Sequence, residues 1–281
     1  PLYYNPLQKD FNNDGQGDLC SSSNSVFYVK GSDLILSDLE GTTLKTYSNI
    51  GGGSNIKSFD ITKSSSSIFI AISIAGSIKI FLESNYASPI LSVNLSGGGV
   101  NDLLFYPCLS CGENRYKLIA PHSTNVKIWD VMINLEDSSQ NSASEETISP
   151  IDAGHYTFTL EKYFNKETAK DYFTVTIAGK LMIREAESLN LLKTMNASEW
   201  LVDSKIFKVN LAENQEDIFA FGVVHSGGQD SQYNIFKLND NSTTPVKEVE
   251  PPQIGWGRAV TVGKTLTKHV GFGVCCESEN A

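Results

Sequence analysis

Short β-branched runs recur along the whole chain, separated by short polar segments. Apolar positions with helical spacing are nearly absent. Runs of this length, rich in Val, Ile, Phe and Tyr and bounded by Gly, Ser, Asn or Asp, are typical of β-strands. The longest run, 68–82, is interrupted at Gly76 and is therefore predicted as two strands that turn at Ala75-Gly76. The sequence predicts an all-β protein.

One strand pattern returns about every fifty residues. It is seen in five runs, at 26–29, 78–81, 126–129, 181–184 and 233–236. Measured between register marks in these runs, the steps are 52, 48, 55 and 52 residues; the marks are Tyr28, Ile80, Ile128, Ile183 and Ile235. Another apolar run precedes each of them, and an earlier and a trailing run complete about four strands per unit.

Four short antiparallel strands repeated at this spacing predict a β-propeller, because each blade buries its faces against its neighbours and ring closure protects the strand edges. We expect a single propeller domain with approximate blades at 1–50, 51–99, 100–150, 151–199, 200–253 and, in part, 254–281. A whole ring of six or seven four-stranded blades would need the chain to continue past Ala281, or another segment to complete it. The Ser-, Glu- and Asn-rich stretch 136–149 is predicted to be an exposed insertion.

A candidate metal site lies at 10–18, near the start of the chain. The oxygen donors at loop positions 1, 3, 5, 7 and 9 are Asp10, Asn12, Asp14, the carbonyl of Gln16 and Asp18. Gly15 permits the sharp turn at position 6, and oxygen donors at this spacing suit Ca²⁺. An EF-hand would place a bidentate Glu at position 12, where this chain has Ser21. The alternatives are a different class of calcium loop or an Asn/Asp/Gly-rich turn without an ion.

The loop at 10–18 resembles the calcium loops of FG-GAP (integrin α-type) propeller blades and of thrombospondin type 3 repeats. In FG-GAP blades the ion lies between the first two strands, and the register of the repeat puts 10–18 at that place in the first unit. The corresponding segments of later units, 60–63, 165–168 and 210–213, lack the ligand spacing. The resemblance implies one Ca²⁺ that stabilises the first blade, and an adhesion-like role.

Part of the chain also resembles a WD repeat. The run 126–130 reads Val-Lys-Ile-Trp-Asp, like the end of such a repeat, and Gly154-His155 resembles its opening dipeptide. However, Ala75 and Ala178 stand where a WD repeat usually carries Asp. An intracellular WD-repeat-like scaffold is therefore the alternative function.

Composition and charge narrow the classes of partner. The formal net charge is −10 and no run of Lys and Arg exists, so a nucleic-acid partner is not expected. No apolar stretch is long enough to span a bilayer, and insertion of this segment into a membrane is not expected. The remaining partner classes are another protein, a glycan, or further copies of the same chain.

Sequons and cysteines indicate a secretory or extracellular location. The predicted glycosylation sites are Asn94, Asn196 and Asn241, each in an Asn-X-Ser/Thr triplet. The chain begins with Pro1, so we expect it to be processed or part of a longer protein. The candidate disulfides are Cys108–Cys111, and Cys20 with Cys275 or Cys276. A zinc site is less favoured, because adjacent cysteines in a strand point to opposite faces.

The sequence contains few signs of a catalytic motif. The sequence has no HExxH and no GxSxG, and Gly263-Lys264-Thr265 lacks the upstream Gly of a phosphate loop. Paired carboxylates cannot be located from sequence spacing, so a propeller-fold hydrolase stays as a lesser alternative. The leading prediction is a non-catalytic, calcium-stabilised extracellular β-propeller that binds a protein or glycan or assembles with itself.

Overall fold

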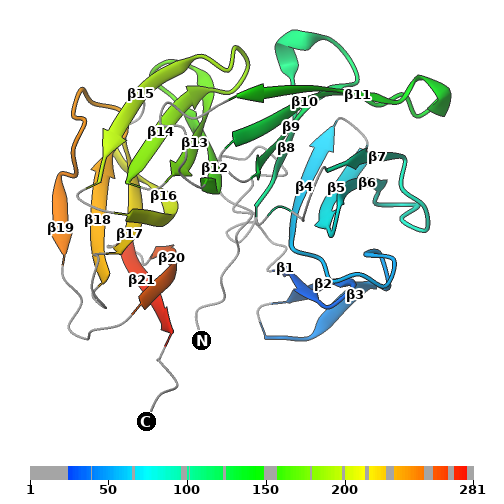
Figure 1. Cartoon of the computed structure of the whole chain (residues 1–281), viewed down its shortest axis with the longest axis horizontal. Coiled ribbons are helices and arrows are strands. Elements are labelled where there is room, and N and C mark those ends of the chain that lie inside the picture. The colour runs from blue at the N-terminus through cyan, green and yellow to red at the C-terminus, as the bar shows by residue number, and fades with distance from the viewer. Residues whose placement is uncertain are drawn as a thin grey trace. The chain divides into compact units, whose positions relative to one another are not determined.

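The computed structural model describes the chain from residue 25 to residue 276, with gaps (Figure 1). The described ranges are 25–38, 40–64, 67–95, 100, 102–122, 125–148, 157–177, 179–197, 200–212, 215–225, 231–249, 256–264 and 269–276. They form two compact units, Pro1–Ala120 with Lys127–Ile148 and Pro121–Val126 with Ser149–Ala281, and each unit is considered by itself. No helix in the described ranges is long and apolar enough to cross a membrane.

The first unit contains three antiparallel sheets. One has the order β1-β2-β3: β1 (Ser25–Lys30), β2 (Asp33–Asp38) and β3 (Thr43–Tyr47). The next has the order β4-β5-β6-β7: β4 (Ser58–Ser64), β5 (Ser67–Ile74), β6 (Ser77–Leu82) and β7 (Leu91–Asn94). The third has the order β11-β10-β9-β8: β8 (Leu104–Pro107), β9 (Arg115–His122), β10 (Asn125–Met132) and β11 (Ser142–Ile148), with 3₁₀ helices η1 (Leu109–Cys111) and η2 (Ser138–Gln140).

The second unit repeats the arrangement. Its first sheet has the order β12-β13-β14-β15: β12 (Thr157–Asn165), β13 (Lys170–Ile177), β14 (Lys180–Glu185) and β15 (Leu191–Asn196). The next has the order β16-β17-β18-β19: β16 (Trp200–Ala212), β17 (Gln215–His225), β18 (Ser231–Lys237) and β19 (Lys247–Val249). The last described sheet is the pair β20 (Trp256–Lys264) and β21 (His269–Cys276).

Sheets of four antiparallel strands in sequence order, one after another along the chain, are the blades of a β-propeller. The prediction of an all-β propeller with four-stranded blades is therefore confirmed.

Strand β5 shows why these runs form blades. Six consecutive residues of β5 are buried, although successive side chains of a strand point to opposite faces. Phe69 and Ala71 join a cluster with residues of the β8–β11 sheet, whereas Ile70 and Ile72 join a cluster with residues of the β1–β3 sheet. A blade buried on both faces reads as a continuous apolar run rather than an alternating one. This explains why residues 69–72 of β5 are apolar without alternation.

The second unit is built on the same principle. Leu181 and Ile183 of β14 pack with Ile218 and Ala220 of β17 and with Phe236 of β18, and all five are buried. Burying a side chain of this size stabilises the fold by about 1.5–3 kcal/mol, so the faces between successive sheets supply most of the favourable free energy.

Two hairpins have a glycine with positive φ in the turn. Gly76, between β5 and β6, has φ 78°, and Gly179, between β13 and β14, has the same φ. A two-residue turn that follows the right-handed twist of the strands needs positive φ, which glycine adopts without steric cost. Gly76 and Gly179 therefore mark equivalent turns.

The structure corrects three details of the sequence interpretation. Tyr28 lies on β1, whereas the strand equivalent to β6 and β14 is β2, the last but one before the next sheet. The segment 60–63 lies inside β4 and is not a loop. The stretch 136–149 is not an insertion, because residues 142–148 form β11, the outer strand of its sheet.

Candidate functional site

The connections between the third and fourth strands lie at one end of each sheet. The second and third strands are joined by tight turns, such as 31–32 and 75–76. Because the strands are antiparallel, connections between the third and fourth strands lie at the opposite end from these turns. They span 83–90, 133–141, 186–190 and 238–246, and in the first sheet the described part is 40–42. Loops presented by a rigid scaffold are where binding residues concentrate.

One of these loops is fixed by the preceding sheet. Lys45 on β3 donates from Nζ to Glu83 Oε1, and the hydroxyl of Tyr47 donates to the same oxygen at 2.6 Å. Glu83 directly follows β6, so its carboxylate belongs to the next sheet. The ring of Tyr86 packs edge-on against that of Tyr47, with 5.1 Å between centroids. We call Lys45, Tyr47 and Glu83 the Lys45 lock.

The electrostatics of the Lys45 lock favour a charged carboxylate. Burial opposes ionisation of Glu83, but the hydrogen bonds from Lys45 and Tyr47 outweigh it, so the pKa of Glu83 is lowered. Burial, together with the hydrogen bond to Glu83, raises the pKa of the Tyr47 phenol above its ordinary range. At neutral pH Glu83 is therefore an anion and Tyr47 a hydrogen-bond donor.

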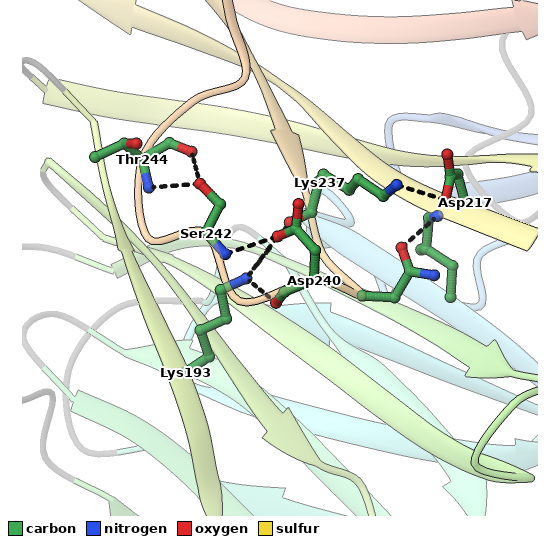
Figure 2. A network of polar contacts seen from close by, with 8 residues as sticks. Lys193, Asp217, Lys237, Asp240, Ser242 and Thr244 are labelled. Carbon is green, nitrogen blue, oxygen red and sulfur yellow. Dashed lines mark hydrogen bonds and ion pairs between the residues drawn. The ribbon is translucent and has the colours of Figure 1, made fainter.

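A second lock holds the loop 238–246 of the second unit (Figure 2). Lys193 on β15 donates from Nζ to the carbonyl of Asp240 at 2.7 Å, to Asp240 Oδ1 at 3.4 Å and to the carbonyl of Lys237 at 3.5 Å. The amide of Ser242 donates to Asp240 Oδ1 at 2.8 Å. We call Lys193 and Asp240 the Lys193 lock.

Further bonds tie the same loop to its surroundings. The amide of Asn196 at the end of β15 donates to the carbonyl of Thr243 at 2.8 Å. The Ser242 hydroxyl donates to the carbonyl of Thr244 at 3.0 Å, and Lys237 forms an ion pair with Asp217 at 2.7 Å (Figure 2). The hydrogen bond to Asp217 raises the pKa of Lys237. Bonds to the preceding sheet and within its own sheet thus fix one conformation of the loop.

The two lysines stand at equivalent places in the repeat. Lys45 lies opposite Leu36, and Lys193 lies opposite Ile183. Leu36 and Ile183 are each the fourth residue of the third strand of their sheet. The same register in the β4–β7 sheet places Leu91 opposite Ile80. Leu91 has no side-chain donor, so in this sheet the hydrogen bond is donated by a side chain of the next sheet's loop instead.

That contact comes from the loop 133–141. The side-chain amide of Asn141 donates to the carbonyl of Ile90 at 3.2 Å. Within the loop, Asn134 Oδ1 accepts from the amides of Glu136 and Asp137 at 2.9 and 3.0 Å, and Asp137 caps η2 by accepting from the amide of Ser139. Three of the third-to-fourth-strand loops are therefore bonded to the preceding sheet or to its loop.

Buried polar contacts connect successive sheets as well. Asp60 on β4 is buried, and its Oδ2 accepts from the amide of Phe105 on β8 at 2.7 Å. In the second unit the hydroxyls of Thr176 on β13 and Ser204 on β16 lie 2.7 Å apart and are fully buried. Unpaired, such groups would cost about 1–3 kcal/mol each, so they fix how one sheet sits against the next.

The site residues predicted from sequence fall into three groups. The calcium loop, with Asp10, Asn12, Asp14, Gln16 and Asp18, lies outside the described residues, as does Cys20. Cys108 and Cys111 form a disulfide across η1 with a Cα–Cα distance of 5.3 Å, while Cys275 and Cys276 end β21. Asn94, Asn196 and Asn241 are all exposed.

No group of three or more His, Cys, Asp or Glu that could hold a metal ion occurs in the part of the chain that the structure describes. The charged groups of both locks are already paired with protein atoms. Their arrangement holds loops in place and does not form a nucleophile, a general base or a ligand cage. The lock residues were missed from sequence because a lone Lys in a strand carries no motif.

Comparison with known proteins agrees with the fold. No protein-family model matches the sequence, and no curated protein matches it significantly. Among solved structures, the chain is similar to the crystal structure of BBS1N in complex with ARL6DN, soaked with lead. The TM-score is 0.53 at 10% identity, and the match covers 91% of this chain and 76% of the other. This likeness supports the propeller fold.

Proposed function

We propose that this chain is a non-catalytic β-propeller module that binds a protein partner through the loops between its third and fourth strands. The observation that carries the proposal is the repeated bonding of these loops to the preceding sheet, through Lys45, Asn141 and Lys193. A loop already held in one conformation loses less conformational entropy when a partner binds. The similar structure holds BBS1N in a complex with ARL6DN, which supports a protein as the partner class.

We further propose that the protein works in the secretory pathway or outside the cell and that Ca²⁺ stabilises its first blade. The calcium proposal rests on the hard oxygen donors of 10–18, which suit that ion at their spacing. The exposure of Asn94, Asn196 and Asn241 supports glycosylation, because an acceptor side chain must be accessible. The Cys108–Cys111 disulfide suits an oxidising compartment.

Photo-cross-linking at two positions tests the partner surface. Leu135 is 50% exposed and lies in the loop 133–141, whereas Ala75 is exposed in the tight turn at the other end of its sheet. With a photoreactive amino acid at either position, we expect partner adducts from Leu135 and none from Ala75. Equal yields at both positions, or adducts from Ala75 alone, would refute a loop-built binding surface.

A thermal melt in excess Ca²⁺ and in EDTA tests the metal. A ligand that binds only the folded state stabilises it by RT ln(1 + [L]/Kd), so a filled site raises the midpoint by several degrees. Asp14→Ala should abolish this rise, and Asp33→Ala, outside the predicted loop, should keep it. Identical midpoints for the wild type in Ca²⁺ and EDTA would show that 10–18 is an ordinary turn.

A further inference from the structure

Strand β11 is the longest of the described fourth strands, each of which forms one edge of its sheet. It has seven residues, compared with five in β3, four in β7, six in β15 and three in β19. Every residue of β11 is exposed or half-buried, and within the described ranges its main chain makes no hydrogen bond outside its own sheet. The edge of β15, by contrast, is used by the bond from Asn196 to Thr243. An outer strand with free N–H and C=O groups is a template for another strand.

The surroundings of this edge are acidic. No Lys or Arg stands between Lys127 and Lys162 in the sequence, while β11 and the loop before it carry Glu136, Asp137, Glu145 and Glu146. All four acids are exposed. The potential beside the edge is therefore negative, which favours a cationic partner.

The two acids of β11 itself differ. Glu145 accepts from Lys127 Nζ at 2.7 Å, and this bond lowers the pKa of Glu145. Glu146, its neighbour in the strand, points to the other face and makes no ion pair with the residues that the structure describes. Glu146 is thus the charge still available to a cation on an added strand.

We propose that β11 binds an extended, Lys- or Arg-bearing segment of a partner protein, which adds to the β8–β11 sheet as a fifth strand. This inference rests on the proposed function and names the partner chemistry. Main-chain bonds to the free edge supply affinity, and a cation opposite Glu146 supplies register. A second copy of this chain fits poorly, because full-length antiparallel pairing of two β11 strands puts Glu145 opposite Glu145, and in-register parallel pairing puts both Glu145 and Glu146 opposite themselves.

The test uses the whole chain and a fluorescein-labelled peptide that alternates Val and Thr around a central Lys-Arg pair. Fluorescence anisotropy gives its Kd for the wild type, for Glu146→Lys and for the matched control Glu248→Lys, which makes the same charge change on exposed β19. We expect Glu146→Lys to weaken binding about tenfold, since attraction becomes repulsion, and Glu248→Lys to change it less than about twofold.

N-methylated peptides separate strand addition from simple charge attraction. Methyl groups on alternate amides block one edge of the peptide and leave its charge unchanged. We expect one methylated register to bind and the other to fail, and the amides of β11 to become protected from hydrogen exchange on binding.

Three results would overturn the proposal: no binding of the basic peptide, equal weakening by Glu146→Lys and Glu248→Lys, or full binding by both methylated peptides. Partner adducts at Leu135 would survive each of these results. The failure of edge binding can thus be distinguished from the failure of the proposed function.

Discussion

The Lys45 and Lys193 locks place the same residue type at the same register of the repeat, yet they fasten different groups. Lys45 bonds a side-chain carboxylate, and its own side chain is 41% exposed. Lys193 bonds chiefly a main-chain carbonyl, and its side chain is 14% exposed. A cation that bonds the main chain fixes the path of the loop directly, whereas one that bonds a carboxylate depends on the ionisation of that acid.

The difference teaches that loop position and blade stability come from separate interactions. Both junctions bury apolar faces of similar kind, around Ile70 in the first unit and Leu181 in the second. The two lysines lie at the rims of these faces, where water competes for their hydrogen bonds. We therefore expect large effects from the cores and smaller, local effects from the locks.

The largest effect should come from the buried faces. Ile70→Ala and Leu181→Ala each remove a fully buried side chain and should each lower the free energy of unfolding by about 2–5 kcal/mol. Urea denaturation measures both. Leu44→Ala, at a 57% exposed position of β3, is the control and should cost less than about 0.5 kcal/mol. A small loss at either core position would contradict the packing of its junction.

The next effect concerns the Tyr47 phenol, which has no counterpart in the Lys193 lock. Tyr47→Phe removes the donor 2.6 Å from Glu83 and should cost about 1–2 kcal/mol, because a partly buried carboxylate loses a hydrogen bond. Tyr86→Phe, on the neighbouring ring, should change stability little. Equal losses in urea denaturation for the two variants would show that the hydroxyl of Tyr47 contributes nothing.

Lys193→Met should cost about 1 kcal/mol, because it keeps most of the stem and removes the ammonium group that donates to Asp240 and to the carbonyl of Lys237. Lys45→Met removes a more exposed ion pair and should cost about 0.2–1 kcal/mol. Raising the salt concentration should shrink the Lys45 effect more than the Lys193 effect. Differential scanning calorimetry at low and at high salt measures both losses of stability. A larger salt effect on Lys193→Met than on Lys45→Met would contradict the distinction between the two lysines.

The smallest effect is a pH dependence confined to the Lys45 lock. The pKa of Glu83 is lower in the folded than in the unfolded chain, so its contribution is present above the unfolded value of about 4.3 and is lost as pH falls through the lower folded value. Glu83→Gln should therefore narrow the stability difference between pH 6 and pH 3. Lys193→Met is the comparison variant and should leave this difference as it is in the wild type, since Lys193 bonds chiefly a main-chain carbonyl. Matched slopes for both variants would refute the distinction.

The sequence predicts the strands well and the lock residues poorly, for a physical reason. Strands β5, β6 and β14 are buried on both faces and appear as apolar runs, so their existence and spacing follow from hydrophobicity alone. Strand β11 buries little, and its polar sequence is indistinguishable from that of a loop. It is a strand because β10 offers it hydrogen bonds.

The lock residues depend on contacts between segments far apart in sequence. Lys45 and Glu83 are separated by 38 positions, and Lys193 and Asp240 by 47. The equivalence of Lys45 and Lys193 becomes visible only when β2 is aligned with β14. The alignment based on Tyr28 was wrong by one strand and therefore concealed it. A register derived from the turn glycines, Gly31 and Gly179, would have aligned the two lysines in sequence.

Hydrogen–deuterium exchange on the wild type, Lys45→Met and Lys193→Met tests most directly whether the locks hold a preformed loop surface. In the wild type the amides of 83–90 and 238–246 should exchange slowly. Lys193→Met should speed exchange about tenfold in 238–246 and leave 83–90 unchanged, and Lys45→Met should do the reverse. Fast exchange of both loops in the wild type, or no change in either variant, would contradict a surface fixed by the preceding sheet.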